Sequence, residues 1–190
     1  IMINNFFKTL LPITIIASSS LCLSEEVLTK FDSSDDKISN WQIVDDGVMG
    51  GLSKGKFKIS DENALVFNGI LSLENNGGFS SIRSQRTKMD LSSYKGIKIR
   101  VKGDGRKYKM RFESDSKYRR MAVSFQHEFE TTAGEWSEVF IPFEGLKASF
   151  RGWKLPTMKF NPQSIQRFGL IIADKKQGPF KITVDWIKAV

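Results

Sequence analysis

Apolar and polar side chains alternate along most of this chain, and this alternation constrains the fold more than any other feature. It is clearest over residues 97–102, 107–113 and 180–186, where aliphatic and aromatic residues take every second position. Successive side chains of a β-strand point to opposite faces, so a period of two is typical of a half-buried strand. We therefore predict strands over these segments, with Trp186 on the buried face.

Shorter apolar segments of the same kind follow one another at regular spacing. They are residues 41–44, 57–60, 65–67, 70–73, 79–83, 121–125, 136–141 and 168–173. Turn signals such as Asn76-Gly77-Gly78 separate them, and only residues 163–167 could form a single helical turn. About ten short strands with no covering helices predict an all-β fold, an antiparallel β-sandwich of jelly-roll type.

The composition limits the chemistry that the chain can perform. It has 190 residues and a formal charge of +8, with one cysteine, Cys22, and one histidine, His127. These counts exclude a disulfide framework, a Cys/His zinc site and a Cys/His catalytic pair within the chain. Gly-x-Ser-x-Gly does not occur, and no paired carboxylates stand out from ordinary surface charge. We predict a non-enzymatic domain with no metal and no cofactor.

The first residues have the pattern of an export signal. Lys8 precedes an apolar run over residues 10–17, and small residues follow at Ser18, Ser19, Ser20 and Ser24. The run is shorter than the roughly twenty apolar residues that cross a bilayer. We expect residues 1–24 to be a cleaved signal peptide, leaving residues 25–190 as a single exported domain, periplasmic or secreted, with no transmembrane span. Leu21 before Cys22 disfavours a lipoprotein, since a lipobox has Gly or Ala there.

A glycine-rich loop runs from Asp45-Asp46 through Gly50-Gly51 to Ser53. Its glycines allow positive φ angles and a close approach of the backbone. The two carboxylates and the hydroxyl could brace the loop by accepting hydrogen bonds from amides, or they could form part of a Ca²⁺ or ligand site. Two acids alone indicate a metal only weakly, so bracing is the favoured interpretation and ligand binding the alternative.

The sequence Gly103-Asp104-Gly105-Arg106 lies between the strands predicted at 97–102 and 107–113. Asp-Gly favours the positive φ of a tight turn, so these strands are expected to form a hairpin. Its outer face would carry six cations: Lys98, Arg100, Lys102, Lys107, Lys109 and Arg111. This basic face predicts either a solvated surface or a site for an acidic protein, anionic lipid or acidic polysaccharide.

Several motifs together resemble the complex I intermediate-associated protein 30 family. They are Trp41-x-x-x-Asp45-Asp46-x-Val48-Met49-Gly50-Gly51-x-Ser53, Gly78-Phe79-x-Ser81-x-Arg83, Val101-x-Gly103-Asp104-Gly105-Arg106-x-Tyr108 and Gly178-Pro179-Phe180. The resemblance covers nearly all of residues 25–190 and implies a galactose-binding-like β-sandwich. Mitochondrial members are assembly factors that hold intermediates of respiratory complex I, so it implies a non-enzymatic, protein-binding assembly or chaperone-like factor. The matched residues are Asp46, Gly50, Gly51, Ser53, Arg83, Asp104, Arg106 and Tyr108.

An exported carbohydrate-binding module is the alternative, because similar sandwiches bind sugars on exposed aromatic platforms. Trp153, in the sequence Arg151-Gly152-Trp153-Lys154, is the best candidate for such a platform. Nucleic acid is disfavoured as a partner, because the aromatic residues near the basic face fall on the buried parity. The candidate binding residues are thus Asp45 and Trp153 together with the residues that match the family.

Overall fold

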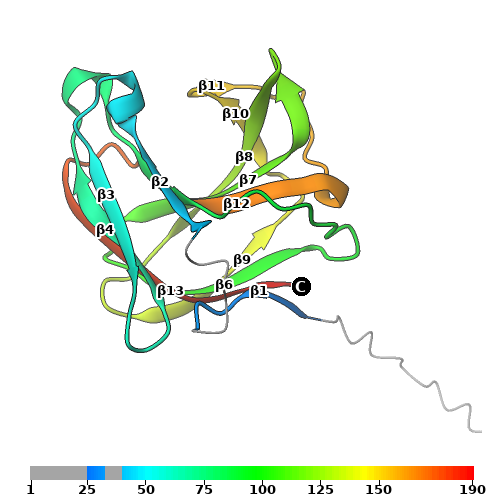
Figure 1. Cartoon of the computed structure of the whole chain (residues 1–190), viewed down its shortest axis with the longest axis horizontal. Coiled ribbons are helices and arrows are strands. Elements are labelled where there is room, and N and C mark those ends of the chain that lie inside the picture. Colours follow the sequence, from blue (N-terminus) through cyan, green and yellow to red (C-terminus); the bar gives the residue numbers. More distant parts are fainter. Residues whose placement is uncertain (1–24, 33–39) are drawn as a thin grey trace, which may run out of the picture.

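The computed structural model describes residues 25–32 and 40–190, which form two antiparallel β-sheets packed face to face (Figure 1). In sheet A the order is β3-β4-β13-β6-β9, with β1 also paired to β13. Its strands are β1 (Glu26–Thr29), β3 (Lys54–Ile59), β4 (Leu65–Leu71), β6 (Gly96–Lys102), β9 (Trp136–Pro142) and β13 (Gly178–Ala189). The all-β, antiparallel sandwich predicted from periodicity is confirmed.

Sheet B has the order β11-β10-β8-β7-β12-β5-β2. Its strands are β2 (Gln42–Asp45), β5 (Ser80–Arg83), β7 (Lys107–Tyr118), β8 (Met121–Glu130), β10 (Lys147–Phe150), β11 (Trp153–Lys154) and β12 (Ile165–Ile172). Three 3-10 turns, η2 (Asp46–Met49), η3 (Glu74–Asn76) and η4 (Pro162–Ser164), complete the described elements. The helical turn expected at 163–167 therefore ends early, because Ile165 begins β12. Within the described ranges, no helix is long and apolar enough to span a membrane.

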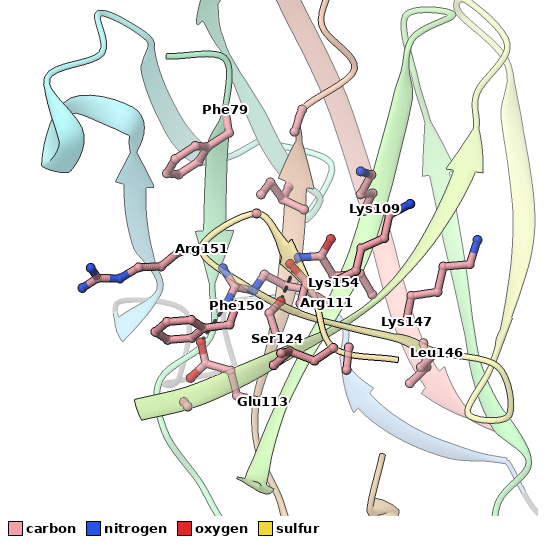
Figure 2. Close-up of a pocket in the computed structure, with 18 of the residues that line it drawn as sticks. Phe79, Lys109, Arg111, Glu113, Ser124, Leu146, Lys147, Phe150, Arg151 and Lys154 are labelled. Atoms are coloured by element: carbon pink, nitrogen blue, oxygen red, sulfur yellow. Dashed lines mark hydrogen bonds and ion pairs between the residues drawn. The ribbon is translucent and has the colours of Figure 1, made fainter. Parts of the chain in front are cut away.

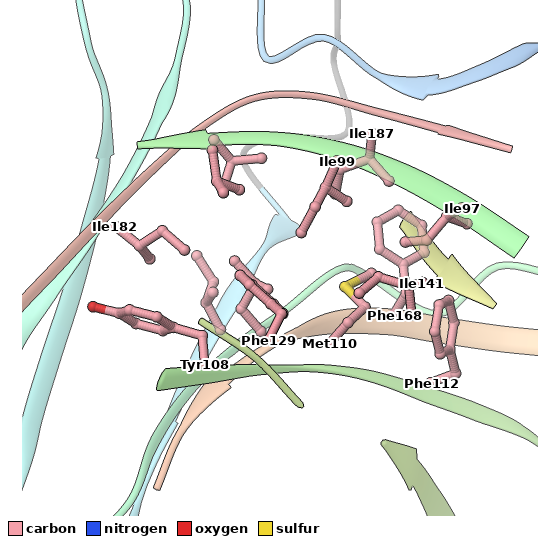
Figure 3. Close-up of a cluster of buried hydrophobic side chains, with 14 of the residues drawn as sticks. Ile97, Ile99, Tyr108, Met110, Phe112, Phe129, Ile141, Phe168, Ile182 and Ile187 are labelled. Carbon is pink, nitrogen blue, oxygen red and sulfur yellow. The ribbon is translucent and has the colours of Figure 1, made fainter. Parts of the chain in front are cut away.

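The core lies between the sheets and consists of the side chains that the period of two predicts to point inward (Figure 3). Ile97, Ile99 and Ile182 enter it from sheet A, and Tyr108 and Met110 from sheet B, all fully buried. Full burial of one such side chain contributes roughly 1.5–3 kcal/mol. The core fixes the parity of every strand, and it thereby fixes which residues reach the outer face of sheet B.

The hairpin expected around Asp104-Gly105 does not form. β6 pairs with β13 and β9 in sheet A, whereas β7 pairs with β8 and β12 in sheet B. The segment between them crosses from one sheet to the other, and Gly105 has the expected positive φ of 83°. Alternation shows which side of a strand is buried and carries no information about its neighbour, and both sheets bury their inner face against one core.

The predicted basic face is consequently divided between two surfaces. Lys98, Arg100 and Lys102 lie on β6 and point away from the core on the outer side of sheet A. The remaining three, Lys107, Lys109 and Arg111, lie on β7 and point outward from sheet B. The prediction of a single basic face is therefore wrong.

The prediction that Trp186 lies on the buried face, made from the alternation of side chains, is also wrong. A β-bulge shifts the register of β13 against β6 between Val184 and Trp186. The extra residue turns Trp186 outward, where the Lys188 Nζ lies 4.5 Å from the centre of its ring, and Ile187 takes the buried position. A bulge puts two residues of one strand opposite one residue of its partner, which reverses the inward parity of the residues beyond it.

Candidate functional site

A groove with a volume of about 1520 Å³ lies on the outer face of sheet B (Figure 2). Outward side chains of β5, β7, β8 and β12 line it, together with residues of the β10–β11 segment and of η2. In Figure 2, Arg111, Glu113 and Ser124 lie close together among these side chains, with Phe150 beside them and Phe79 farther away. A groove of this volume has room for a ligand of substantial size.

Strand pairing aligns the central residues of the groove in one row across the sheet. Gly169 of β12 lies opposite Arg83 of β5 on one side and Arg111 of β7 on the other. A Cβ atom at position 169 would lie 2.9 Å from the Arg83 Cα and still closer to the Ile82 carbonyl oxygen. The strands approach too closely there for any side chain, so a bare strip of backbone separates two arginines.

A single carboxylate, Glu113, lies beside this row and is 4% exposed. Its Oε1 is 3.0 Å from the Arg111 Nη2 and 3.8 Å from the Arg83 Nη1, and its Oε2 is 3.1 Å from the Arg86 Nη2. Arg167 lies opposite Glu113 in the register of β12 and β7. Its Nε atom is buried and has no hydrogen-bond partner in the described part of the chain.

Burial and crowding by like charges perturb two of these guanidiniums. Burial, the neighbouring charge of Arg83 and that of Arg167 lower the pKa of Arg111 to about 10, although Glu113 opposes the shift. Burial and the charges of Arg167 and Arg86 likewise lower the pKa of Arg83, again against Glu113. A pKa of about 10 still leaves Arg111 cationic at neutral pH. The floor of the groove therefore carries positive charge that its own carboxylate does not neutralise.

The lining of the groove as a whole is also positively charged. Eight lysines and arginines and two glutamates, Glu113 and Glu128, line the described groove, which leaves a formal excess of six positive charges. Its rim is apolar, because Val48 is 74% exposed and Met49 is 59% exposed on η2. A ligand with acidic groups and some apolar surface would match this arrangement.

The predicted glycine-rich loop lies beside the groove and is internally braced. The Asp46 side chain is buried and accepts hydrogen bonds from the amides of Ser53 (2.9 Å), Gly78 (2.6 Å) and Phe79 (3.2 Å). Its Oδ2 also accepts the Ser53 hydroxyl at 2.5 Å. Gly51 approaches this carboxylate so closely that an added Cβ would lie 2.8 Å from the Asp46 Cβ. The geometry agrees with the bracing interpretation.

Asp45 and Gly50 also stabilise the conformation of this loop. Asp45 accepts the Gly55 amide at 3.0 Å and the Ser80 hydroxyl at 2.5 Å, which ties β2 to β3 and β5. Gly50 has a φ of 91° and ends η2. No group of three or more His, Cys, Asp or Glu side chains among residues 25–32 and 40–190 could hold a metal ion.

Asp104, Arg106 and Tyr108 form a second, separate brace. The Arg106 guanidinium pairs with both oxygens of Asp174, at 2.6 and 3.0 Å, and donates to the Pro179 carbonyl at 2.8 Å. Asp104 accepts the Tyr108 hydroxyl at 3.1 Å and the Lys181 amide at 2.7 Å. These contacts tie the β6–β7 crossover to the segment that leads into β13.

The candidate residues predicted from the sequence thus lie in different parts of the structure. Of these candidates, Arg83, Lys109 and Arg111 line the groove and the others do not. Lys107 forms an ion pair with Glu130 at 2.5 Å. Trp153 is 77% exposed on β11, as its proposed role as an aromatic platform requires.

The prediction missed Arg86, Arg167 and the pairing role of Glu113. The parity of residues 107–113 already puts Glu113 on the face of Lys109 and Arg111, but the position of Arg167 depends on the pairing of β12 with β7.

The buried carboxylate of Asp46 makes the free energy of unfolding depend on pH. Although burial acts in the opposite direction, the hydrogen bonds from Ser53, Gly78 and Phe79 lower the pKa of Asp46 below its ordinary value of 3.8. A depressed folded-state pKa stabilises the fold fully above the unfolded pKa, and this contribution is lost as the pH falls through the lower, folded value. The urea concentration at the midpoint of unfolding should therefore decrease as the pH is lowered through 3.8 and below, because the folded-state pKa of Asp46 lies below that value.

The matched comparison uses Asp46→Asn and the surface change Asp61→Asn. The first variant should lose part of this pH dependence, whereas the second should keep it. Equal slopes in both variants would show that Asp46 is not its source.

A model of the complex I intermediate-associated protein 30 family matches residues 29–184. The complex I intermediate-associated protein 30, mitochondrial, of Mus musculus is 26% identical over 181 residues, covering 85% of this chain and 55% of that protein. The Drosophila melanogaster protein of that name is 25% identical over 173 residues, covering 80% and 58%. The chain thus spans about half the length of the curated relatives that it matches.

These names also correct one prediction. The relatives are named as mitochondrial proteins, so the expected export to a periplasmic or secreted location is wrong. The residues on which that expectation rested, 1–24, lie outside the described part of the chain.

Solved structures share the sandwich at low identity. A family 11 carbohydrate-binding module from Clostridium thermocellum, in complex with a β-1,3-1,4-mixed-linked tetrasaccharide, superposes with a TM-score of 0.65. It is 16% identical, with 87% of this chain and 95% of that chain covered. An agarase superposes with a TM-score of 0.60 at 9% identity, covering 87% of this chain and 24% of the agarase. At such identities the likeness is one of fold alone.

Proposed function

Because the chain belongs to the complex I intermediate-associated protein 30 family, we propose that it is a non-enzymatic mitochondrial assembly factor that binds a polypeptide of a complex I intermediate. The groove on sheet B carries the proposal. Its lining combines uncompensated cations with exposed apolar side chains, which suits recognition of a protein segment. The loops that carry most of the family motifs brace the scaffold around it.

The test is affinity purification of the tagged full chain from its own cells, followed by mass spectrometry of complex I subunits. Wild type should recover such subunits, and Val48→Asp with Met49→Asp should reduce recovery about tenfold, because both residues form the exposed rim. Ile70→Asp is the matched control, since Ile70 is 61% exposed on sheet A. Equal recovery by all variants would place the partner elsewhere, and no recovery by wild type would reject the function.

Carbohydrate binding is a second candidate, favoured by Trp153, which is 77% exposed next to the groove-lining Lys154. An exposed indole can stack on a sugar ring and contribute substantial contact area. Titration with the mixed-linked β-glucan tetrasaccharide tests it. We expect no binding; a complex that Trp153→Ala abolishes would favour this function over assembly.

A further inference from the structure

We propose that the groove on sheet B recognises an acidic, extended segment of its partner polypeptide, whose carboxylates bind between Arg83, Arg111 and Arg167. This inference rests on the proposed function and specifies the chemistry of the partner. It follows from three features of the groove: an excess of guanidinium groups, a position without a side chain between two of the arginines in the strand register, and an apolar rim.

The excess of charge is the first feature. Arg83, Arg86 and Arg111 all contact Glu113, and Arg167 lies opposite it in the strand register. The Arg111 side chain is 10% exposed and cannot escape its like-charged neighbours by turning into solvent. Bringing cations together in a partly buried site is unfavourable unless anions compensate for them. Acidic groups of a ligand would supply the missing compensation.

The gap at Gly169 is the second feature. Neighbouring strands lie about 4.8 Å apart, so the backbones of β5 and β7 are roughly 10 Å apart across β12. Gly169 puts no side chain between Arg83 and Arg111. A carboxylate entering this gap could accept hydrogen bonds from both guanidiniums. Arginine suits this role because its planar fork of donors matches the two oxygens of a carboxylate.

The buried Nε of Arg167 adds a donor at the same place. It has no hydrogen-bond partner among the described residues, and buried polar atoms are normally hydrogen-bonded. Arg167 belongs to the groove lining and lies on β12, the strand that carries Gly169, two residues before it. A second acidic group on the ligand could satisfy the Arg167 guanidinium while the first lies between Arg83 and Arg111.

The third feature is the rim, which favours a polypeptide over other polyanions. Val48 and Met49 offer exposed apolar contacts beside the cations, and Phe150 lines the same groove. The buried position of Arg111 keeps it away from a flat membrane surface. A chain that alternates acidic and apolar side chains satisfies both the floor and the rim.

The binding experiment uses fluorescence anisotropy with a labelled peptide in which glutamate alternates with leucine and serine. Its matched probe has glutamine at every glutamate position. The full chain should bind the glutamate peptide at least about tenfold more tightly, which corresponds to about 1.4 kcal/mol. The difference should shrink as the salt concentration rises, because salt screens the charge interaction.

The double variant Arg83→Gln, Arg167→Gln should lose at least about tenfold in affinity for the glutamate peptide. The control, Arg100→Gln with Lys102→Gln, changes the net charge equally on sheet A and should bind like wild type. If the first variant melts early, the single variant Arg83→Gln replaces it, because the contact of Arg83 with Glu113 is the longest of the three, at 3.8 Å, and its loss should disturb the fold least. Equal affinity for both peptides, or equal losses in both double variants, would overturn the proposal.

Competition by an anionic membrane tests whether the groove binds lipid instead of a polypeptide. Vesicles of phosphatidylglycerol that displace the peptide and require the same arginines would assign the groove to a membrane instead. Capture of complex I subunits separates this inference from the function on which it rests. If capture persists while the acidic peptide fails to bind, only the chemistry assigned to the segment is wrong; if capture itself fails, the assembly function is wrong.

Discussion

Replacing Asp46 with alanine is expected to lower the free energy of unfolding by about 4 kcal/mol. The change removes the acceptor of three backbone amides and of the Ser53 hydroxyl in a buried loop. A buried donor left without a partner costs about 1–3 kcal/mol, and water entering the cavity would satisfy some of the four donors. Urea unfolding followed by tryptophan fluorescence measures the loss.

Asp61→Ala provides the control for Asp46→Ala, because Asp61 lies in the exposed turn between β3 and β4. A surface change of this kind usually alters the free energy of unfolding by less than about 0.5 kcal/mol. If Asp46→Ala destabilised the protein by less than about 1 kcal/mol, Asp46 would not be the brace that its contacts indicate.

Replacing Arg106 with alanine is expected to cost about 3–5 kcal/mol. Asp174, whose side chain is 2% exposed, would lose the guanidinium that pairs with both of its oxygens and would remain buried without a compensating charge. The same guanidinium holds the Pro179 carbonyl, so the entry into β13 should also loosen. Thermal and urea unfolding of the purified variant measure the change.

Two variants separate the effect of the buried pair from that of charge alone. Arg106→Met with Asp174→Leu should recover most of the lost stability, because replacing both members of a buried pair by apolar groups leaves no unpaired charge. Lys107→Ala, next to it in sequence, should barely move the midpoint, because its ion pair with Glu130 is exposed to solvent. A double variant as unstable as Arg106→Ala would contradict this account.

The strands could be predicted from the sequence because burial of alternate side chains is a local property. Residues 97–102, 107–113 and 168–172 are strands, and the aliphatic side chains of Ile97 and Ile99 are buried as expected. Pairing is non-local, so the sequence did not reveal that β6 and β7 belong to different sheets. The bulge before Trp186 depends on the fit of β13 against β6, which periodicity also cannot show.

The candidate site likewise has a part that local sequence features predict and a part that depends on strand pairing. The loop around Asp46 and the crossover at Asp104-Gly105 were found from turn chemistry, which is local, and both have bracing contacts. The groove needed the register of three strands, because only the pairing of β12 with β5 and β7 brings Arg83, Arg111 and Arg167 to one place. Their separation along the chain is too large for any motif to connect them.

Gly169 has a consequence for how variation in this family would be interpreted. The absence of a side chain there is required by close packing of the backbone, and it leaves no side chain between Arg83 and Arg111 in the strand register. A substitution at Gly169 would disturb the packing of β12 against β5 and, under the binding mode proposed above, the binding of the ligand. A loss of function in such a variant could not be attributed to one of these effects alone. Selectivity would therefore have to evolve through the flanking strands, where a change of side chain leaves the sheet intact.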